Sequence, residues 1–221
     1  MSQANKGVSS ARNQGIKRST GNWIALLDSD DEWLPDKLKM QTDVLSKNTD
    51  HFVCHTEEIW IRNGKRVNQK NKHKKSGGWI FSECLTLCAM SPSSIMLHRS
   101  LLDEFSGFDE SLPACEDYDL WLKICAKYPV LFVNTALIKK YGGHEDQLSQ
   151  KYWGMDRFRI RALDNLLQYH RLKPEDKQNA VAMLIKKIDI VVNGAIKRNK
   201  KHDVEDLIKL RTIYTAESET K

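Results

Sequence analysis

The chain has 221 residues, of which 40% are hydrophobic and 29% are charged, and its formal net charge is +6. This length suits one domain with an appendage, and the apolar content excludes a disordered chain. The basic excess comes with no nucleic-acid-binding motif, so we expect no nucleic-acid partner.

The cysteines and the first residues of the chain indicate the cellular compartment of the protein. The five cysteines are odd in number and lack the spacing of a zinc knuckle, so we expect reduced and mostly buried thiols. The polar residues 1–7 do not resemble a signal peptide, and no apolar run reaches the length of a membrane span. These features predict a cytoplasmic protein, with peripheral contact to the inner face of the membrane as an option.

A short basic helix is expected first, over residues 11–16, with Ser9 or Ser10 as its cap. Arg12 and Asn13 lie on this helix. Both residue types are common on protein surfaces without any function. The planar fork of donors on Arg12 also suits a phosphate, so a binding role is the alternative.

Residues 23–33 are the most informative stretch. Five apolar residues run directly into four acids: Asp28, Asp30, Asp31 and Glu32. The apolar run predicts a buried strand, and its carboxyl end is where open α/β sheets bind ligands. Carboxylates spaced one residue apart there suit a hard cation that holds a diphosphate. The alternative is a solvated loop that caps the helix beginning at Pro35.

The middle of the chain predicts alternating short elements. We expect a helix over 35–47 with Leu38 and Leu45 on its buried face, a strand over 52–61, a hairpin turn at Asn63-Gly64, a strand over 94–98 and a helix over 100–105. Basic residues gather at 65–66, 70–75 and 197–201. They indicate either solvated segments or attraction to anionic lipid headgroups or a phosphate-bearing substrate.

A second acidic group opens the next expected helix, which begins at Asp117. Tyr118, Trp121 and Cys125 would form its buried stripe. Glu116 and Asp117 at its N-terminus have two interpretations. Acids there complement the helix dipole, or they serve as a carboxylate base at the rim of a site.

The last third changes from mixed to helical character. A strand over 130–138 and a glycine-hinged loop over 141–149, which carries His144, close the mixed part. Helices are expected over 152–170, from Pro174 onward, and from a cap at Asp203 to about Tyr214. We therefore expect two parts, a core over residues 1–150 and a helical extension over 151–221.

In this order, the segments resemble those of nucleotide-sugar glycosyltransferases of the GT-A fold, family 2. The resemblance lies in residues 5–16, 21–38, 107–121 and 142–149. It implies an α/β fold, a partial GT-A mixed sheet flanked by helices with a C-terminal helical tail. Family members begin with nucleotide-binding strands ahead of this region, and the resemblance implies that the chain lacks them.

The resemblance also implies a reaction, an inverting and metal-dependent sugar transfer. The donor would be a nucleotide diphosphate sugar, with UDP favoured, and the acceptor a hydroxyl of a glycan or lipid-linked glycan, as in envelope polysaccharide synthesis. A truncated non-catalytic scaffold, or a module that binds a membrane or partner, is the alternative.

Roles for individual residues follow from the same resemblance. The base would be Asp117, with Glu116 as the other candidate. The donor phosphates would contact Arg12, Asn13, Asp28 and His144. A Mg²⁺ or Mn²⁺ ion would bind at Asp28, Asp30 and Asp31.

Overall fold

The computed structural model describes residues 3–143, 151–199 and 204–219. The chain divides into two compact units, Met1–Lys151 and Tyr152–Lys221. Among the described residues, no helix combines the length and the apolar character needed to cross a membrane.

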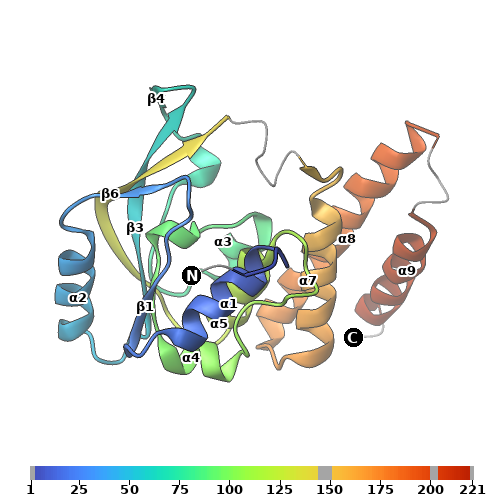
Figure 1. Cartoon of the computed structure of the whole chain (residues 1–221). Helices are drawn as coiled ribbons and strands as arrows, with labels where there is room; N and C mark the ends of the chain where they lie inside the picture. The colour runs from blue at the N-terminus through green and yellow to red at the C-terminus, as the bar shows by residue number, and fades with distance from the viewer. Residues whose placement is uncertain (1–2, 144–150, 200–203, 220–221) are drawn as a thin grey trace. The chain divides into compact units, whose positions relative to one another are not determined.

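A mixed six-stranded sheet is the centre of the first unit (Figure 1). Its strands are β1 (Trp23–Ala25), β2 (Glu32–Trp33), β3 (Val53–Arg62), β4 (Lys65–Val67), β5 (Met96–His98) and β6 (Leu131–Gly142). The order is β1-β5-β3-β6-β2, and β4 pairs with β3. The long β3–β6 pair is parallel and the other pairs are antiparallel. The sheet and its flanking helices confirm the predicted mixed α/β class.

Helices cover both faces of this sheet. They are α1 (Val8–Arg18), α2 (Lys37–Lys47), α3 (Phe81–Thr86), α4 (Arg99–Glu104) and α5 (Glu116–Cys125), with 3₁₀ turns η1 (Asn71–His73) and η2 (Pro92–Ser94). Figure 1 shows α2 on one face, and α3, α4 and α5 on the other. Leu45 of α2 packs on Cys54, Met96 and Leu137. Side chains alternate along a strand, so Val53 and Leu97 point to the opposite face.

The buried face of α2 differs from the prediction. Leu38 is 43% exposed, whereas Lys37 and Gln41 are fully buried beside the sheet. The Lys37 ammonium donates to Gln41 Oε1 at 2.7 Å and lies 4.4 Å from the centre of the Trp33 ring. Burial lowers the pKa of Lys37 to about 8. Because the buried stripe contains two polar residues, apolar periodicity alone placed the helix face wrongly.

Several predicted boundaries also change. The first helix, expected over 11–16 with Ser9 or Ser10 as its cap, spans Val8–Arg18, so that both serines lie inside it. The strand predicted over 23–27 keeps only Trp23–Ala25, and Leu27 is 48% exposed. The predicted loop at 141 is still strand, because β6 pairs with β3 as far as Gly142. The helix predicted from 152 begins at Asp156, after Gly154 with its positive φ of 62°. In contrast, Asn63 and Gly64 both have positive φ, as the predicted hairpin turn requires.

His55 on β3 is a fully buried ionisable residue. Its Nε2 donates to the Ser76 carbonyl at 2.8 Å, and its Nδ1 has no partner among the described residues. Burial, together with the nearby Lys75, lowers the pKa of His55 to about 3. The ring is therefore neutral in the folded chain.

This burial predicts a loss of stability on mild acidification. The unfolded chain takes up the proton first, because the His55 pKa is lower in the folded state. We expect the free energy of unfolding to fall by about 2 to 3 kcal/mol between about pH 6.5 and about pH 4.5. Urea denaturation across this range measures the slope. His55→Gln should flatten it; a slope equal to that of the wild type would contradict the assignment.

The second unit consists of helices. These are α7 (Asp156–Tyr169), α8 (Pro174–Ile196) and α9 (Glu205–Glu219). The Tyr214 hydroxyl donates to Asp164 at 2.7 Å, which ties α9 to α7, and Arg211 pairs with Asp189 of α8 at 2.6 Å. This unit confirms the predicted helical tail.

Candidate active site

Arg12 joins three segments that are distant in the sequence. From α1, its Nη2 donates to Asp28 Oδ1 and its Nη1 to Glu116 Oε1, both at 2.6 Å. The Arg12 side chain is 12% exposed and that of Glu116 is 6% exposed. Burial would lower the pKa of Arg12, but Asp28 and Glu116 outweigh it and raise the pKa. The guanidinium therefore stays charged between two carboxylates that the sequence separates by 88 residues.

The acidic turn after β1 is held by Ser93 of η2. The Ser93 hydroxyl accepts the Asp28 backbone N–H at 3.0 Å and donates to Asp31 Oδ2 at 2.5 Å. The other Asp31 oxygen accepts the Tyr141 backbone N–H at 3.0 Å. Both oxygens of Asp31 are thus engaged within the protein, and burial raises the pKa of this carboxyl. Its predicted metal contact stays a prediction that would require one of these bonds to open.

Asp28 and Asp30 are the better placed pair for a cation. Asp30 is exposed, and Asp28 is 30% exposed with Oδ1 on Arg12. Within residues 3–143, 151–199 and 204–219, no three metal-binding side chains converge. Two carboxylates suit Mg²⁺, which is usually bound by one or two carboxylates together with substrate phosphates and water. The donor set therefore fits a cation that is shared with a diphosphate.

Asn13 holds the turn that precedes α5. Its Nδ2 donates to the Phe108 carbonyl at 2.8 Å and to Glu110 Oε1 at 3.0 Å, while its Oδ1 accepts the Phe108 N–H at 2.9 Å. Gly107 has φ +69°, and a Cβ there would lie 2.7 Å from Asn13 Oδ1. The amide is fully occupied in this turn, so donor binding by Asn13 stays a prediction.

The two acids at the start of α5 have different surroundings. Glu116 is buried on Arg12, and its Oε2 has no hydrogen-bond partner in the described part of the chain. Burial, with the neighbouring Asp117 charge, raises the pKa of Glu116 despite Arg12. Asp117 is half-buried; its Oδ2 accepts a bond from the Cys88 thiol at 3.0 Å and its Oδ1 accepts the Tyr118 N–H at 2.7 Å. The more accessible Asp117 is better placed to meet a substrate.

Lys140 is a member of this region that the sequence pattern did not suggest. Burial would lower the pKa of Lys140, but Glu58, Cys88, Asp31 and Asp117 together raise it. This residue lies on β6, between the predicted strand over 130–138 and the predicted loop over 141–149. Ser93 and Cys88 were missed as well, because a serine or cysteine in an irregular segment carries no sequence signal of its own.

Two further predictions need comment. His144 lies outside the described residues. In the basic run 70–75, Lys75 is not solvated: it is 7% exposed and pairs with Glu58 at 3.4 Å. A charge run thus misled the prediction at one position, because pairing with a buried carboxylate overrides the usual preference of lysine for water.

Comparison with known proteins finds similarity to glycosyltransferases. Residues 1–105 match the family model described as glycosyl transferase family 2. The chain is 33% identical over 145 residues to the Escherichia coli UDP-Glc:alpha-D-GlcNAc-diphosphoundecaprenol beta-1,3-glucosyltransferase WfgD, covering 65% of this chain and 54% of WfgD. It is 26% identical over 157 residues to the amylovoran biosynthesis glycosyltransferase AmsB of Erwinia amylovora, covering 64% and 51%. The match thus spans about half the length of these two relatives.

Solved structures support the fold. S. aureus TarS 1-349 in complex with UDP-GlcNAc aligns with a TM-score of 0.56 at 15% identity, covering 100% of this chain and 74% of that one. The mannosyltransferase PcManGT of Pyrobaculum calidifontis, in complex with GDP-Man and Mn²⁺, aligns with a TM-score of 0.54 at 12% identity, covering 96% and 64%. The fold is GT-A-like, and residues 1–105, just under half of the chain, match the glycosyl transferase family 2 model.

Proposed function

We propose that this chain transfers a sugar, with inversion, from a nucleotide diphosphate donor to a hydroxyl acceptor. The observation that carries the proposal is the Arg12 bridge, which brings the acidic turn after β1 against the acidic start of α5. A UDP-sugar donor and a lipid-linked glycan acceptor are favoured by the similarity to WfgD, a UDP-Glc:alpha-D-GlcNAc-diphosphoundecaprenol glucosyltransferase. Such an acceptor would bring the chain to a membrane surface, and envelope polysaccharide synthesis is the process it fits.

The charge balance of the site supports a divalent cation. Five carboxylates gather there: Asp28, Asp30, Asp31, Glu116 and Asp117. Arg12 and Lys140 are the cations that interact with them. The excess negative charge would repel a diphosphate. Asp30, with the free side of Asp28, would hold Mg²⁺ or Mn²⁺, which on binding would offset this repulsion and stabilise the departing diphosphate.

Asp117 is the proposed base. Its carboxylate takes the proton of the acceptor hydroxyl as that oxygen attacks the anomeric carbon. The bond from this carbon to the diphosphate oxygen breaks on the opposite side, and the nucleoside diphosphate leaves with the bonding electron pair. Glu116 is the weaker candidate, because it is buried and already bonded to Arg12.

Arg12, Asn13, Asp31 and Ser93 would act by positioning. Arg12 fixes the Asp28 carboxylate, and Ser93 fixes the backbone of the same turn. Asn13 holds the turn at Gly107–Phe108 that leads towards α5. A site arranged in advance in this way does not have to order its side chains when the donor binds.

Removing the proposed metal ligand tests this function through binding. UDP with Mn²⁺, at about a hundred times its dissociation constant, should stabilise the wild-type chain by about 2.7 kcal/mol. For a chain of this size the melting temperature should rise by roughly 5 to 11 °C. Asp30→Asn should abolish the rise, because the remaining carboxylate cannot hold the ion alone. Differential scanning fluorimetry with each ligand singly and both together measures it.

Asp36→Asn is the matched control. It removes one exposed negative charge from the same region without touching the acidic turn. This variant should keep the full shift with UDP and Mn²⁺. The metal assignment fails if Asp30→Asn is stabilised as much as the control.

A further inference from the structure

A second site lies on the first unit, at the hairpin of β3 and β4. A cavity of about 370 Å³ opens there. Its walls come from both strands and from the segment that follows them: Glu57, Glu58, Ile59, Trp60, Arg66, Val67, Asn68, Gln69, Lys70, Asn71 and Lys74. This volume is within the range of small-ligand pockets in proteins. None of these residues belongs to the proposed transfer site.

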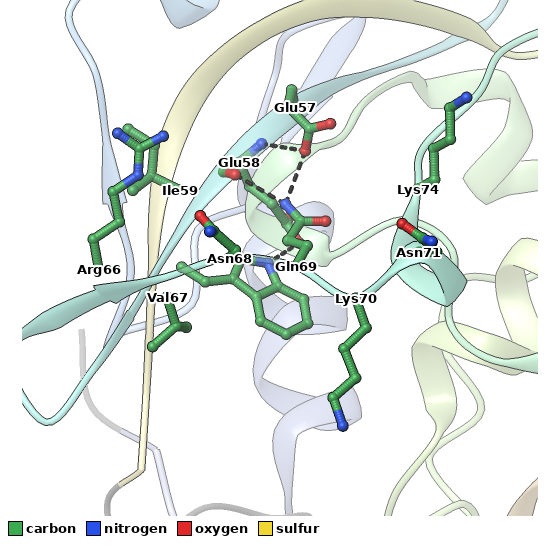
Figure 2. Close-up of a pocket in the computed structure, with 11 residues that line it drawn as sticks. Glu57, Glu58, Ile59, Arg66, Val67, Asn68, Gln69, Lys70, Asn71 and Lys74 are labelled. Carbon is green, nitrogen blue, oxygen red and sulfur yellow. Dashed lines mark hydrogen bonds between the residues drawn. The ribbon is translucent and has the colours of Figure 1, made fainter.

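Irregular strand pairing shapes the cavity. The register of β3 against β6 shifts between Thr56 and Glu57 and again between Glu57 and Glu58. Such bulges re-aim side chains and are frequent beside binding sites. Figure 2 shows Gln69 between the two glutamates, where its Nε2 donates to Glu57 Oε1 and to the Glu58 carbonyl, both at 3.0 Å.

Glu58 forms a firmly held wall of the cavity. Its Oε1 accepts the Trp60 indole N–H at 2.7 Å, and its Oε2 accepts the Ser91 hydroxyl at 2.5 Å and lies 3.4 Å from Lys75 Nζ. Burial opposes its ionisation, but Lys75 and Lys140 outweigh burial, so the pKa of Glu58 is below its usual value. Lys75 and Lys140 therefore offset the negative charge of Glu58, and the hydrogen bonds from Trp60 and Ser91 fix the orientation of its carboxylate.

The rest of the lining is electropositive. In the described part of the chain, the cations Arg66, Lys70 and Lys74 form no ion pair, and Figure 2 shows the side chains of Lys70 and Lys74 extending away from each other. Glu57 is the one carboxylate left to oppose them in the lining, and it is bonded to Gln69. The cavity therefore offers net positive charge to a ligand.

The neutral lining groups suit a sugar. Asn68 and Asn71 carry amides, which can both donate to and accept from hydroxyl groups. The half-buried Trp60 adds an aromatic surface, against which the C–H face of a sugar ring packs well. Amides and an indole beside unpaired cations match a ligand that is both hydroxyl-rich and negatively charged.

A half-buried lysine, Lys140, interacts with both this cavity and the transfer site. Lys140 interacts electrostatically with Glu58 of the cavity wall and also with Asp31 and Asp117. The same lysine therefore interacts with a charged wall of the cavity and with Asp117, the proposed acceptor base.

We infer that the cavity at the β3–β4 hairpin binds a negatively charged sugar unit, such as a sugar phosphate. Trp60 and the amides contact the sugar, and the positive charges of Arg66, Lys70 and Lys74 attract the anionic group. Under the proposed function, on which this last assignment rests, the bound unit belongs to the acceptor. The binding itself needs neither the donor nor the metal.

Titration with glucose 1-phosphate tests the site directly. In ¹H–¹⁵N spectra of the full chain, the indole signal missing from Trp60→Phe identifies Trp60. Glucose 1-phosphate should shift this signal in the wild type without UDP or Mn²⁺, whereas glucose alone and inorganic phosphate alone should bind at least about tenfold more weakly. The signal of Trp79, which is 58% exposed and outside the cavity, should stay in place. Equal shifts with inorganic phosphate alone would mean that the sugar is not recognised.

A double variant that removes two lysines of the cavity lining provides a second test of the inference. Lys70→Ala with Lys74→Ala should weaken glucose 1-phosphate binding about tenfold, or about 1.4 kcal/mol. Lys17→Ala with Lys47→Ala removes two exposed lysines elsewhere and should leave binding unchanged. The inference is overturned if the first pair binds as well as the wild type, or if no Trp60 signal moves. Sugar phosphate binding without any response to UDP and Mn²⁺ would instead support the cavity and refute the proposed transfer.

Discussion

Asp117→Asn should lower the turnover number about 10²- to 10⁴-fold, the usual contribution of a general base. The substitution keeps the shape of the side chain, and the amide oxygen can still accept the Tyr118 N–H. Donor binding should therefore stay within about twofold of wild type, since Asp117 acts on the acceptor. Release of UDP from a bound UDP-sugar, measured with and without acceptor, separates the two effects.

Two companion variants make this result decisive. Asp103→Asn removes an exposed carboxylate from α4 and should have no effect on turnover. Glu116→Gln should reduce stability more than Asp117→Asn does, because Glu116 is the buried partner of Arg12. If Asp117→Asn keeps near-normal turnover, or loses only stability, then Asp117 stabilises the N-terminus of α5 and another residue is the base.

Arg12→Met should lower the free energy of unfolding by about 2 to 4 kcal/mol. Loss of one partner from a buried ion pair typically costs 3 to 5 kcal/mol, and Asp28 is partly exposed, so the smaller range applies. Methionine keeps most of the apolar stem, so the loss reports mainly on the charge. Urea denaturation followed by tryptophan fluorescence measures it.

A double variant distinguishes charge from packing. Arg12→Met combined with Glu116→Gln leaves no buried carboxylate without its cation, so the pair should be less destabilised than the sum of the single variants. Arg18→Met, at the exposed end of α1, is the control and should stay within about 0.5 kcal/mol of wild type. Additive losses at Arg12 and Glu116 would show that the bridge contributes little.

The sequence predicted element types better than contacts. The acids after β1 and at the start of α5 were identified because a run of carboxylates next to an apolar segment is visible in the chain itself. The Arg12 bridge was not, since no pattern relates residues 12, 28 and 116. The resemblance implied a phosphate role for Arg12, whereas the structure shows it engaged by two carboxylates.

Buried polar residues explain most of the remaining misses. Lys37 and Lys75 were interpreted as surface residues, because burial of a lysine is uncommon without a partner, and Gln41 was given no role. Their partners are distant along the chain or on the same helix face, and become apparent only with the fold. The cavity at the β3–β4 hairpin was also unpredicted, since it depends on bulges that a strand pattern does not reveal.

The most direct test is to locate the cation itself. Mn²⁺ is paramagnetic and broadens the NMR signals of nearby nuclei, so it should act most strongly on the backbone amides of Asp28–Asp31 when UDP is present. The same titration of Asp30→Asn should lose this localised broadening, whereas Asp36→Asn should keep it. Broadening centred elsewhere in the described residues, or unchanged in Asp30→Asn, would contradict a metal–diphosphate site at the acidic turn.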